Sequence, residues 1–396
     1  MGDERFFALL TPEYLMNIIL PRLSVVWLAL AACVASLRSE DVSPLPQTRG
    51  NSRGESAESR SERFGPRNHP YYAPTFDLSG LPPYVPEHAV TGTIRVWGLN
   101  YLTDSHVARY WDEGFAKFQP GAKIAYTTPT GLVAFPGLIT GLADIGADRK
   151  LTFDECLTFN RVFGCDPLEI TFATGSLNVS GWAPAIGIFV HQGNPLARIT
   201  LKQIDGVFGA ERDGAYIGTT WHPEFARGPE QNIRAWGQLG LTGEWADKPI
   251  SIYGRALKLH QQIQIEAKAF QGGSKWNEKL HECYREMLGY LEKDRYGMAF
   301  GEISMMTPAV KILSLADRDG GPYVELTLEN CQNRTYPLHA ESYFYLNRKP
   351  GAPLDPKLRE FLRFVLSREG QDAIQRDGKW LPLTADAARG QLAKLE

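Results

Sequence analysis

The sequence predicts an α/β fold, and three observations support this prediction. From Val90 onward, segments typical of strands alternate with segments typical of amphipathic helices. The chain has 396 residues, enough for two or three ordinary domains. Hydrophobic residues make up 43% of it, a proportion that supports a sizeable core.

The first 35 residues have the layout of a secretory signal. From Met16 the chain carries one positive charge, Arg22, then an apolar run over Leu23–Ala32, then small residues. That run is too short to span a bilayer comfortably. Acidic residues before Met16 suit a signal poorly, so we expect translation to begin at Met16. The mature protein is then expected to be periplasmic or otherwise extracytoplasmic.

A lipidation signal and a linker are predicted next. Leu30-Ala31-Ala32-Cys33 resembles the lipobox of bacterial lipoproteins, in which the cysteine becomes the lipidated N-terminus. The alternative is plain cleavage after Ala35, which removes Cys33. Residues 36–89 are rich in Ser, Arg, Glu, Pro and Gly, which predicts a disordered tether. Such a tether would hold a folded part away from a membrane.

The predicted elements of the folded part follow in order along the chain. Strands are expected at Thr93–Trp97, Lys123–Thr127, Ala143–Ala147, within Ile170–Val190 as two extended runs, and at Pro249–Tyr253, Gly297–Phe300, Val310–Leu315 and Ser342–Leu346. Helices are expected at Ser105–Phe118, after the turn Thr128–Gly131, and at Thr152–Phe163, Leu201–Phe208, Leu257–Phe270, Trp276–Leu291 and Leu358–Gln375. Tyr216–Gln231 is predicted to be a long loop.

The stretch Pro249–Phe270 carries the chemistry of most interest. A strand that turns at Gly254 into a helix leaves the first backbone N–H groups of that helix unpaired. These groups and the helix dipole favour an anion. Arg255 lies at the turn, and its planar fork of donors suits a carboxylate or a phosphate. The alternative is that Arg255 is an ordinary surface residue.

Four cysteines follow Cys33 in the sequence, namely Cys156, Cys165, Cys283 and Cys331. In an oxidising compartment pairing is possible, and Cys156 with Cys165 is the pair we expect. Their spacing matches no zinc pattern. Free buried thiols are the alternative.

Charge and motifs exclude several functional classes. The formal net charge is −3, which gives no positive field for nucleic acid. No G-x-S-x-G, H-E-x-x-H, P-loop or G-x-G-x-x-G pattern occurs where its chemistry needs it. The sequence therefore favours a binding protein over an enzyme.

Several motifs, taken together, resemble the phosphate-type solute-binding proteins of bacterial ABC importers. They occur in the family's order over roughly Thr91–Leu383, and six or more of them make a strong signal. They are Gly141–Glu155 (GLADIGADRKLTFDE), Ile188–Leu196 (IFVHQGNPL), Ile199–Gly209 (ITLKQIDGVFG), Pro249–Arg255 (PISIYGR), Tyr296–Phe300 (YGMAF), Phe361–Gln371 (FLRFVLSREGQ) and Gly378–Leu383 (GKWLPL).

The resemblance implies a two-lobed class II periplasmic-binding-protein fold, in which the chain crosses twice between lobes that close on a ligand. The first lobe is expected at 90–178 plus 307–396, and the second at 179–306. The implied ligand is phosphate or another small oxyanion, and the implied partner is an ABC permease. No cofactor and no metal is implied, the chain is expected to be a monomer, and membrane contact is expected only through a lipid anchor.

The resemblance also implies the residues of a ligand site, carried over position by position. Backbone N–H groups, hydroxyls and an arginine hold the anion in the family. The expected residues here are Asn100, Tyr101, Thr130, Gly131, Asp148, Arg149, Arg255, Lys258 and His260. For Asp148, a helix cap or a structural ion pair is the alternative.

The ligand loops also depart from the family pattern. The first loop has Leu99 and Tyr101 where serine and threonine are usual, although Asn100 and Tyr101 can still donate hydrogen bonds. Leu259 replaces a serine in the third loop. A second hypothesis is therefore a diverged member that binds another solute, or acts in sensing or as an accessory surface protein. Aromatic and histidine side chains of the long loop and its flank can line an altered cleft or simply pack: Trp221, His222 and Trp236.

Overall fold

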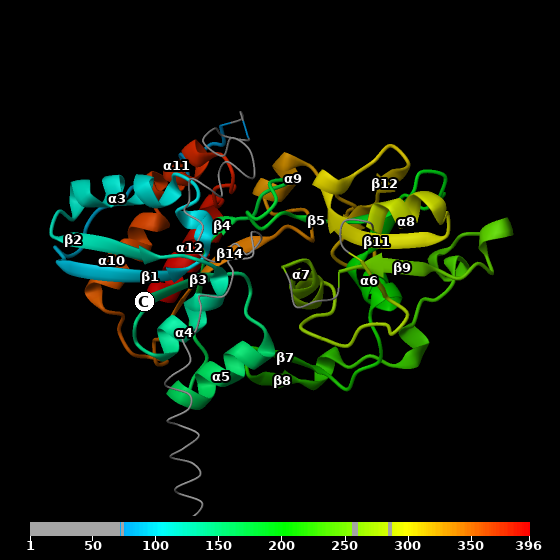
Figure 1. Cartoon of the computed structure of the whole chain (residues 1–396), viewed down its shortest axis with the longest axis horizontal. Coiled ribbons are helices and arrows are strands. Elements are labelled where there is room, and N and C mark those ends of the chain that lie inside the picture. Colours follow the sequence, from blue (N-terminus) through cyan, green and yellow to red (C-terminus); the bar gives the residue numbers. More distant parts are fainter. Residues whose placement is uncertain (1–71, 73–74, 256–259, 284–286) are drawn as a thin grey trace, which may run out of the picture. The chain divides into compact units, whose positions relative to one another are not determined.

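The computed structural model describes residues 72, 75–255, 260–283 and 287–396. In this part of the chain, strands and helices alternate and build two five-stranded sheets (Figure 1). The predicted signal, the lipidation site Cys33 and the site residue Lys258 lie outside the described residues. The predicted α/β fold class is confirmed.

The first sheet has the strand order β2-β1-β3-β14-β4. Its strands are β1 (Gly92–Gly98), β2 (Ala122–Thr127), β3 (Ile145–Asp148), β4 (Leu168–Thr174) and β14 (Glu341–Leu346). β1 pairs in parallel with β2 and β3, so these three strands end at the same edge of the sheet. β14 runs antiparallel between β3 and β4. We call this sheet and its helices the first lobe.

The second sheet repeats this plan with the order β10-β9-β11-β5-β12. Its strands are β5 (Ile186–His191), β9 (Ser251–Gly254), β10 (His281–Glu282), β11 (Gly297–Glu302) and β12 (Val310–Ile312). β9 is parallel to β10 and β11, and β5 is the antiparallel fourth strand. This sheet and its helices are the second lobe.

The chain crosses between the two sheets twice, as a two-lobed class II fold requires. It leaves the first sheet after Thr174, enters the second at Ile186, and returns at Glu341. The strand β12 belongs to the second sheet, because it pairs with β5. The chain therefore returns to the first lobe later than the expected boundary at 306/307, because β12 follows that boundary and still belongs to the second sheet. The exact limits of the lobes stay a prediction.

The two crossing segments lie beside each other and share backbone hydrogen bonds. Gly175 donates to Ala340 over 2.8 Å, and Ile186 donates to Leu338 over 3.1 Å. The hydroxyl of Tyr336, which is fully buried, donates to the Ile186 carbonyl over 2.9 Å. Polar groups of the buried crossings are thereby paired, as burial requires.

Two smaller pairs of strands complete the second lobe. β6 (Arg198–Thr200) lies parallel to β13 (Ser314–Ala316). β7 (Ala215–Ile217) and β8 (Thr220–His222) form an antiparallel hairpin, the β7–β8 hairpin. This hairpin lies within the segment predicted as a plain loop, because the tight turn at Gly218, whose φ is +58°, lets the chain reverse.

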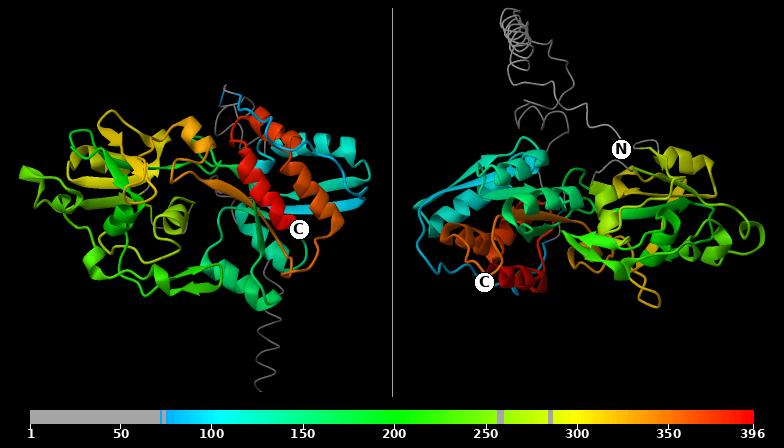
Figure 2. Two further views of the ribbon diagram at one scale, coloured as in Figure 1. Left: turned by 180° about the vertical axis from the view of Figure 1, so that it is seen from behind. Right: turned by 90° about the horizontal axis from the view of Figure 1, so that it is seen from below.

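Ten α-helices of the described residues cover the two sheets. They are α3 (Val107–Phe118), α4 (Ala134–Ile139), α5 (Phe153–Phe163), α6 (Leu201–Phe208), α7 (His260–Lys268), α8 (Met287–Lys293), α9 (Leu328–Gln332), α10 (Pro356–Val365), α11 (Arg368–Asp377) and α12 (Ala385–Leu392). α12 lies against the first sheet, far from it in sequence (Figure 2), and Gln391 accepts a 2.9 Å hydrogen bond from the Thr171 amide.

Two predicted helices were wrong in extent. The helix expected at Leu358–Gln375 is two helices, because Ser367 caps α11 by accepting a hydrogen bond from the Gly370 amide. The helix expected at Trp276–Leu291 is replaced by β10 and the shorter α8. In that stretch, the β10 residues pair with Tyr253 and Gly254 of β9, so sheet pairing overrides helix propensity.

Each lobe has its own aromatic core. In the first lobe the buried rings include Trp111, Phe115, Phe172, Phe344 and Phe361, and in the second Phe208, Trp236, Phe270 and Phe300. The expected cysteine pair does not form, since Cys156 and Cys165 are both free buried thiols. In the described residues, no helix is both long enough and apolar enough to cross a bilayer.

The end of the predicted linker 36–89 is ordered where the structure describes it. Leu81 and Tyr84 are 2% and 4% exposed and belong to the core of the first lobe. The Tyr84 hydroxyl donates to Glu360 over 2.6 Å, and its ring lies edge-on to Phe364. These two apolar side chains in a Pro-rich stretch provide enough buried area to order the segment.

We expect Tyr84→Ala to lower the free energy of unfolding by about 3–5 kcal/mol, because it leaves a cavity and removes the partner of a buried carboxylate. Urea denaturation measures the change. The neighbouring Val85→Ala is the control, since Val85 is 62% exposed and should cost under about 0.5 kcal/mol. Equal effects of the two substitutions would contradict the packing of this segment.

Candidate functional site

The candidate site begins where the parallel strands of the first sheet end. β1, β2 and β3 lead into loops that hold Asn100, Thr130 with Gly131, and Asp148 with Arg149. In open α/β sheets, ligands bind at this carboxyl edge of the strands. The first two loops are joined by a 2.7 Å hydrogen bond between the hydroxyls of Thr103 and Thr128.

Asp148 and Gly131 are in direct contact across two of these loops. A methyl group added at Gly131 would collide with the Asp148 carboxylate. The absence of a side chain is therefore what lets the carboxylate approach the backbone at this position. Thr130, which precedes it, has an extended backbone and a half-buried side chain.

The Asp148 carboxyl is buried, with 5% of its surface exposed. Burial raises its pKa to about 6, although the Arg149 guanidinium and amide oppose the shift. The Arg149 amide donates to Oδ1 over 2.8 Å, and the Arg149 guanidinium lies 3.6 Å from Oδ2, as in the alternative of a structural ion pair.

Arg149 is held by two carboxylates. Its guanidinium donates to both oxygens of Glu155 over 3.2–3.3 Å and lies 3.6 Å from Asp148 Oδ2. Glu155 is fixed in turn by the capping box at the start of α5, where it accepts from the Thr152 amide and hydroxyl. The first turn of α5 therefore positions Arg149 through Glu155.

The second lobe contributes a matching cluster at the end of β9 and β11. Arg255 follows β9 and is half-buried. Burial raises the pKa of Glu302, and the charge of Arg255 opposes this shift to a smaller extent. Gln261 on α7 donates to Glu302 Oε1 over 2.6 Å. The end of β11 is therefore tied to the first turn of α7.

His260, the first residue of α7, faces both lobes. Its Nε2 lies 3.1 Å from the Pro184 carbonyl in the first crossing, so Nε2 carries the proton and donates. Burial and, to a smaller extent, the charge of Arg149 together lower its pKa to about 4. The imidazole is therefore neutral near pH 7, with Nδ1 as an acceptor.

The structure thus brings some of the predicted site residues close together, whereas others contact different residues. Gly131, Asp148, Arg149 and His260 lie within contact or electrostatic reach of one another. The amide of Asn100 donates to Asp104 over 2.6 Å. The ring of Tyr101 packs on Trp182 of the first crossing, with centroids 4.7 Å apart.

The charges of the candidate site nearly cancel. Two guanidiniums, those of Arg149 and Arg255, face three carboxyl groups: Asp148, Glu155 and Glu302. Burial raises the pKa of Asp148 and of Glu302, so both are more readily neutral than ordinary carboxyls. The site is most favourable to an anion when these two groups are protonated.

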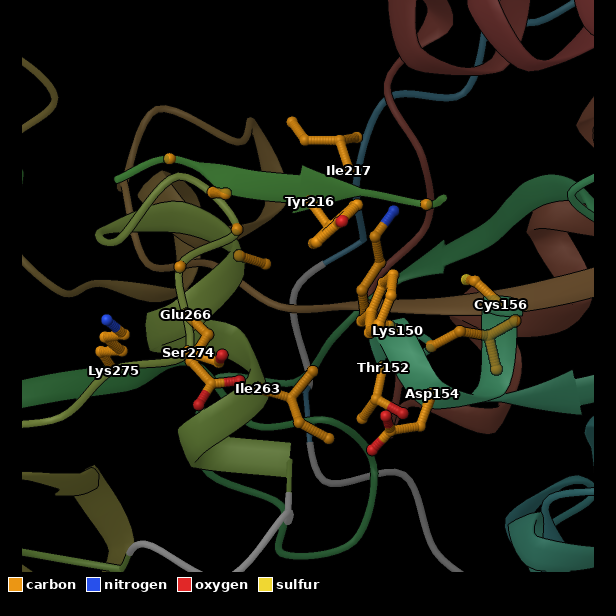
Figure 3. A pocket seen from close by; sticks show the side chains of 18 of the residues that line it. Lys150, Thr152, Asp154, Cys156, Tyr216, Ile217, Ile263, Glu266, Ser274 and Lys275 are labelled. Carbon is orange, nitrogen blue, oxygen red and sulfur yellow. The ribbon is translucent and has the colours of Figure 1, made fainter. Parts of the chain in front are cut away.

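A pocket of about 690 Å³ is lined by residues that follow Arg149 and His260 in the chain (Figure 3). One wall is Lys150–Asp154, which directly follows Arg149, and another is the face of α7 with Gln262, Ile263 and Glu266. The β7–β8 hairpin supplies the third wall. The pocket therefore has walls from both lobes.

The β7–β8 hairpin reaches the first lobe through specific contacts. The Thr219 amide and hydroxyl donate to Asp166 over 2.8 and 2.7 Å, and Asn160 donates to the same hydroxyl over 3.1 Å. The ring of Tyr216 stacks on Phe153, with centroids 4.2 Å apart. Contacts of both kinds bind this insertion of the second lobe to α5 of the first.

The aromatic residues singled out near the long loop have different positions. Trp221 lines the pocket, as one hypothesis expected. Trp236 is fully buried, packs edge-on against Trp245 and donates to the Tyr296 carbonyl, so it is a core residue. His222 pairs with Glu224 over 2.8 Å.

Sequence reasoning missed Glu155, Gln261 and Glu302 as site residues. A signal existed for Glu155, because Thr152-x-x-Glu155 is a capping-box pattern directly after Arg149. No pattern marks Gln261 or Glu302, whose pairing depends on packing between α7 and β11. In the described ranges, no group of three or more His, Cys, Asp or Glu residues is arranged to hold a metal ion.

Comparisons with known proteins agree with the motifs. No protein-family model matches the chain. Over 317 residues it is 29% identical to the phosphate-binding protein PstS of Pseudomonas aeruginosa, a match that covers 80% of this chain and 90% of that protein. This similarity confirms the resemblance to phosphate-type solute-binding proteins of ABC importers.

Two solved structures similar to the chain are also described as proteins of phosphate transport or as PstS. One is an ABC-type phosphate transport receptor from Vibrio cholerae, with 17% identity, a TM-score of 0.44, and coverage of 73% of this chain and 99% of that one. Another is PstS from Borrelia burgdorferi, with 16% identity, a TM-score of 0.44, and coverage of 74% and 99%.

We expect Asp148→Asn to stabilise the protein at neutral pH. The pKa of Asp148 is about 6 in the folded state and near 4 in the unfolded state. Below about pH 4 the carboxyl is protonated in both states and does not change the free energy of unfolding. Between about pH 4 and pH 6 the buried carboxyl lowers the free energy of unfolding progressively. Removing the charge should add about 2–3 kcal/mol to the free energy of unfolding at pH 7.5. Urea denaturation at pH 7.5 and pH 4 should show the gain vanishing at the lower pH.

The exposed Asp247→Asn is the control for this measurement and should change stability little at either pH. An Asp148→Asn variant that is no more stable than the parent at pH 7.5 would refute the assignment of a strained, buried charge.

Proposed function

We propose that the chain captures a small oxyanion, phosphate first, between its lobes and delivers it to an ABC permease. The observation that carries the proposal is the Asp148–Arg149 ion pair of the first lobe, whose arginine is near enough to His260 of the second for its charge to lower the His260 pKa. The similarity to a phosphate-binding protein over most of both chains supports the same ligand class.

The chemistry of the residues supports this proposal. Arg149 and Arg255 supply planar forks of donors that suit a tetrahedral oxyanion. Gly131, which has no side chain, lets the Asp148 carboxylate lie against the loop that follows β2. Asp148 and the Nδ1 atom of neutral His260 are acceptors for a proton on the anion, which sulfate lacks and hydrogen phosphate carries.

Closure of the lobes would bring these groups to the anion together. The first lobe supplies Gly131, Asp148 and Arg149, and the second supplies Arg255 and His260. Because the lobes are joined by two crossings, they can move as a hinge. The function is binding and release without turnover.

A second candidate function is recognition of a different solute, with a role in sensing or as an accessory surface protein. The near cancellation of charge around Arg149 and Arg255 favours it, since a dianion gains most from a positive site. The packing of the Tyr101 ring on Trp182, at a position where the resemblance implies a threonine, favours it too.

The location completes the proposal. We propose an extracytoplasmic monomer, exported through its N-terminal signal and anchored through a lipid on Cys33, with a permease of the ABC class as its membrane partner. The match to a binding protein of phosphate, and the resemblance of the N-terminus to a lipobox, support this assignment.

We expect millimolar inorganic phosphate to raise the melting temperature of the purified chain through mass action. Arg255→Ala should weaken phosphate binding at least about tenfold, because it removes charge-assisted hydrogen bonds. Isothermal titration calorimetry measures both proteins. Arg198→Ala is the control, since the Arg198 guanidinium lies 4.7 Å from the Tyr323 ring, away from the site. If phosphate, arsenate and sulfate all fail to raise the melting temperature and to bind in calorimetry, the proposal is wrong.

We also expect sulfate to bind more tightly as the pH falls from 7.5 to 5. Sulfate keeps its charge over this range, whereas Asp148, with a pKa of about 6, loses its own. The gain should be about tenfold for loss of one nearby like charge. His260 contributes little, because its pKa is about 4. In Asp148→Asn the dependence should largely disappear, and an unchanged dependence would assign it to another group.

A further inference from the structure

We propose that the pocket beside the oxyanion residues binds a planar, uncharged organic group carried by the same ligand. The ligand class is then an organic monophosphate or phosphonate with an aromatic ring. This inference rests on the proposed capture of an oxyanion and names its substrate more closely.

The size of the pocket exceeds what an inorganic anion needs. Its volume of about 690 Å³ lies in the range of small-molecule sites. A cavity of about 150 Å³ already holds a benzene ring. An oxyanion held at Arg149 and His260 would leave this space for a substituent.

The wall supplied by the β7–β8 hairpin is aromatic and half exposed. Tyr216 and Trp221 are 40% and 45% exposed, and their rings lie 4.9 Å apart at a tilt. Phe153 of α5 extends this wall by stacking on Tyr216. Large apolar side chains that line a hollow and remain open to it mark binding sites, because a flat guest ring gains both burial and stacking there.

A buried acceptor on α7 faces the same pocket. Gln262 lines it and is only 9% exposed, and its Oε1 atom has no hydrogen-bond partner among the residues that the structure describes. The Nε2 atom of Gln262 donates to Glu266 over 2.8 Å, which fixes the amide orientation. An unpaired buried acceptor costs free energy, and a donor on the guest, such as a hydroxyl or a ring N–H, would recover it.

The charges that line the pocket balance. They are three cations, Lys150, Arg212 and Lys275, and three carboxylates, Asp154, Asp213 and Glu266. Lys150 is paired with Glu169 over 2.7 Å, and Arg212 with Asp205 over 2.6 Å. The guest group in this pocket is therefore uncharged, in contrast to the oxyanion beside it.

The pocket and the oxyanion residues are continuous along two segments of chain. Lys150, Leu151 and Thr152 follow Arg149 directly, and all three line the pocket. On α7, Ile263 and Ala267 lie one and two turns after His260 on neighbouring positions of the helix, and both line the pocket. A ligand of two parts can therefore place its anion at Arg149 and its ring beside Tyr216.

The test compares two esters of equal charge on the full chain. Calorimetry with methyl phosphate and phenyl phosphate should show that phenyl phosphate binds about tenfold more tightly, because only its ring reaches the aromatic wall. Trp221→Ala should remove most of this preference and leave the affinity for methyl phosphate within about twofold. Trp221 is half exposed, so the variant should fold.

Tyr323→Ala is the matched control, because Tyr323 is a 37% exposed aromatic residue of the second lobe that does not line the pocket. It should keep the preference for phenyl phosphate.

Three outcomes would overturn the inference in distinguishable ways. Equal affinity of the parent for both esters would refute the organic pocket and leave oxyanion capture standing. An equal loss for both esters in Trp221→Ala would assign Trp221 to the oxyanion site or to folding. Failure of the parent to bind either ester would reject the proposed function and this inference together.

Discussion

The structure depends on the burial of α7, a helix whose inner face is made largely of glutamine. Gln261, Gln262 and Gln264 are each less than 10% exposed. A buried amide costs free energy for each of its polar atoms that is left without a hydrogen bond. Gln261 therefore donates to Glu302 at the end of β11, and Gln264 donates to the His339 carbonyl in the second crossing. These bonds fix α7 to the sheet of its own lobe and to the segment around which the lobes would move.

This anchoring relates the candidate site to the crossings. His260 begins α7 beside the site and donates to the first crossing at Pro184, whereas Lys268 ends α7 against the imidazole of His339 in the second, 2.9 Å away. Burial lowers the pKa of Lys268 to about 7. A guest that displaces the first turn of α7 would thus act on both crossings at once, which is how a binding event can be coupled to a change in the angle between lobes.

The sequence predicted the order of strands and helices well because hydrophobic periodicity is a local property. It predicted the sites at Gly131, Asp148 and Arg149 only through resemblance to a family, since no local rule reveals a contact between loops. The break at Ser367 was missed because the apolar spacing continues across it while both helices face one core. Glu302 was missed because its partner Gln261 is 41 residues away, and only packing brings them together. Leu81 and Tyr84 were assigned to a linker because the composition of residues 36–89 is mostly polar, and two buried side chains change that average little.

The β7–β8 hairpin shows how an insertion can alter specificity without changing the fold. Both five-stranded sheets have the same plan, and the hairpin belongs to neither of them. Its turn instead fits the first lobe closely, because a side chain at Gly218 would collide with Asp166, the carboxylate that Thr219 binds. The hairpin therefore contributes a wall with the aromatic residues Tyr216 and Trp221 at the place where both lobes meet. A protein that captured only a bare anion would have no physical use for that wall, whereas a ligand with a ring would be enclosed by it.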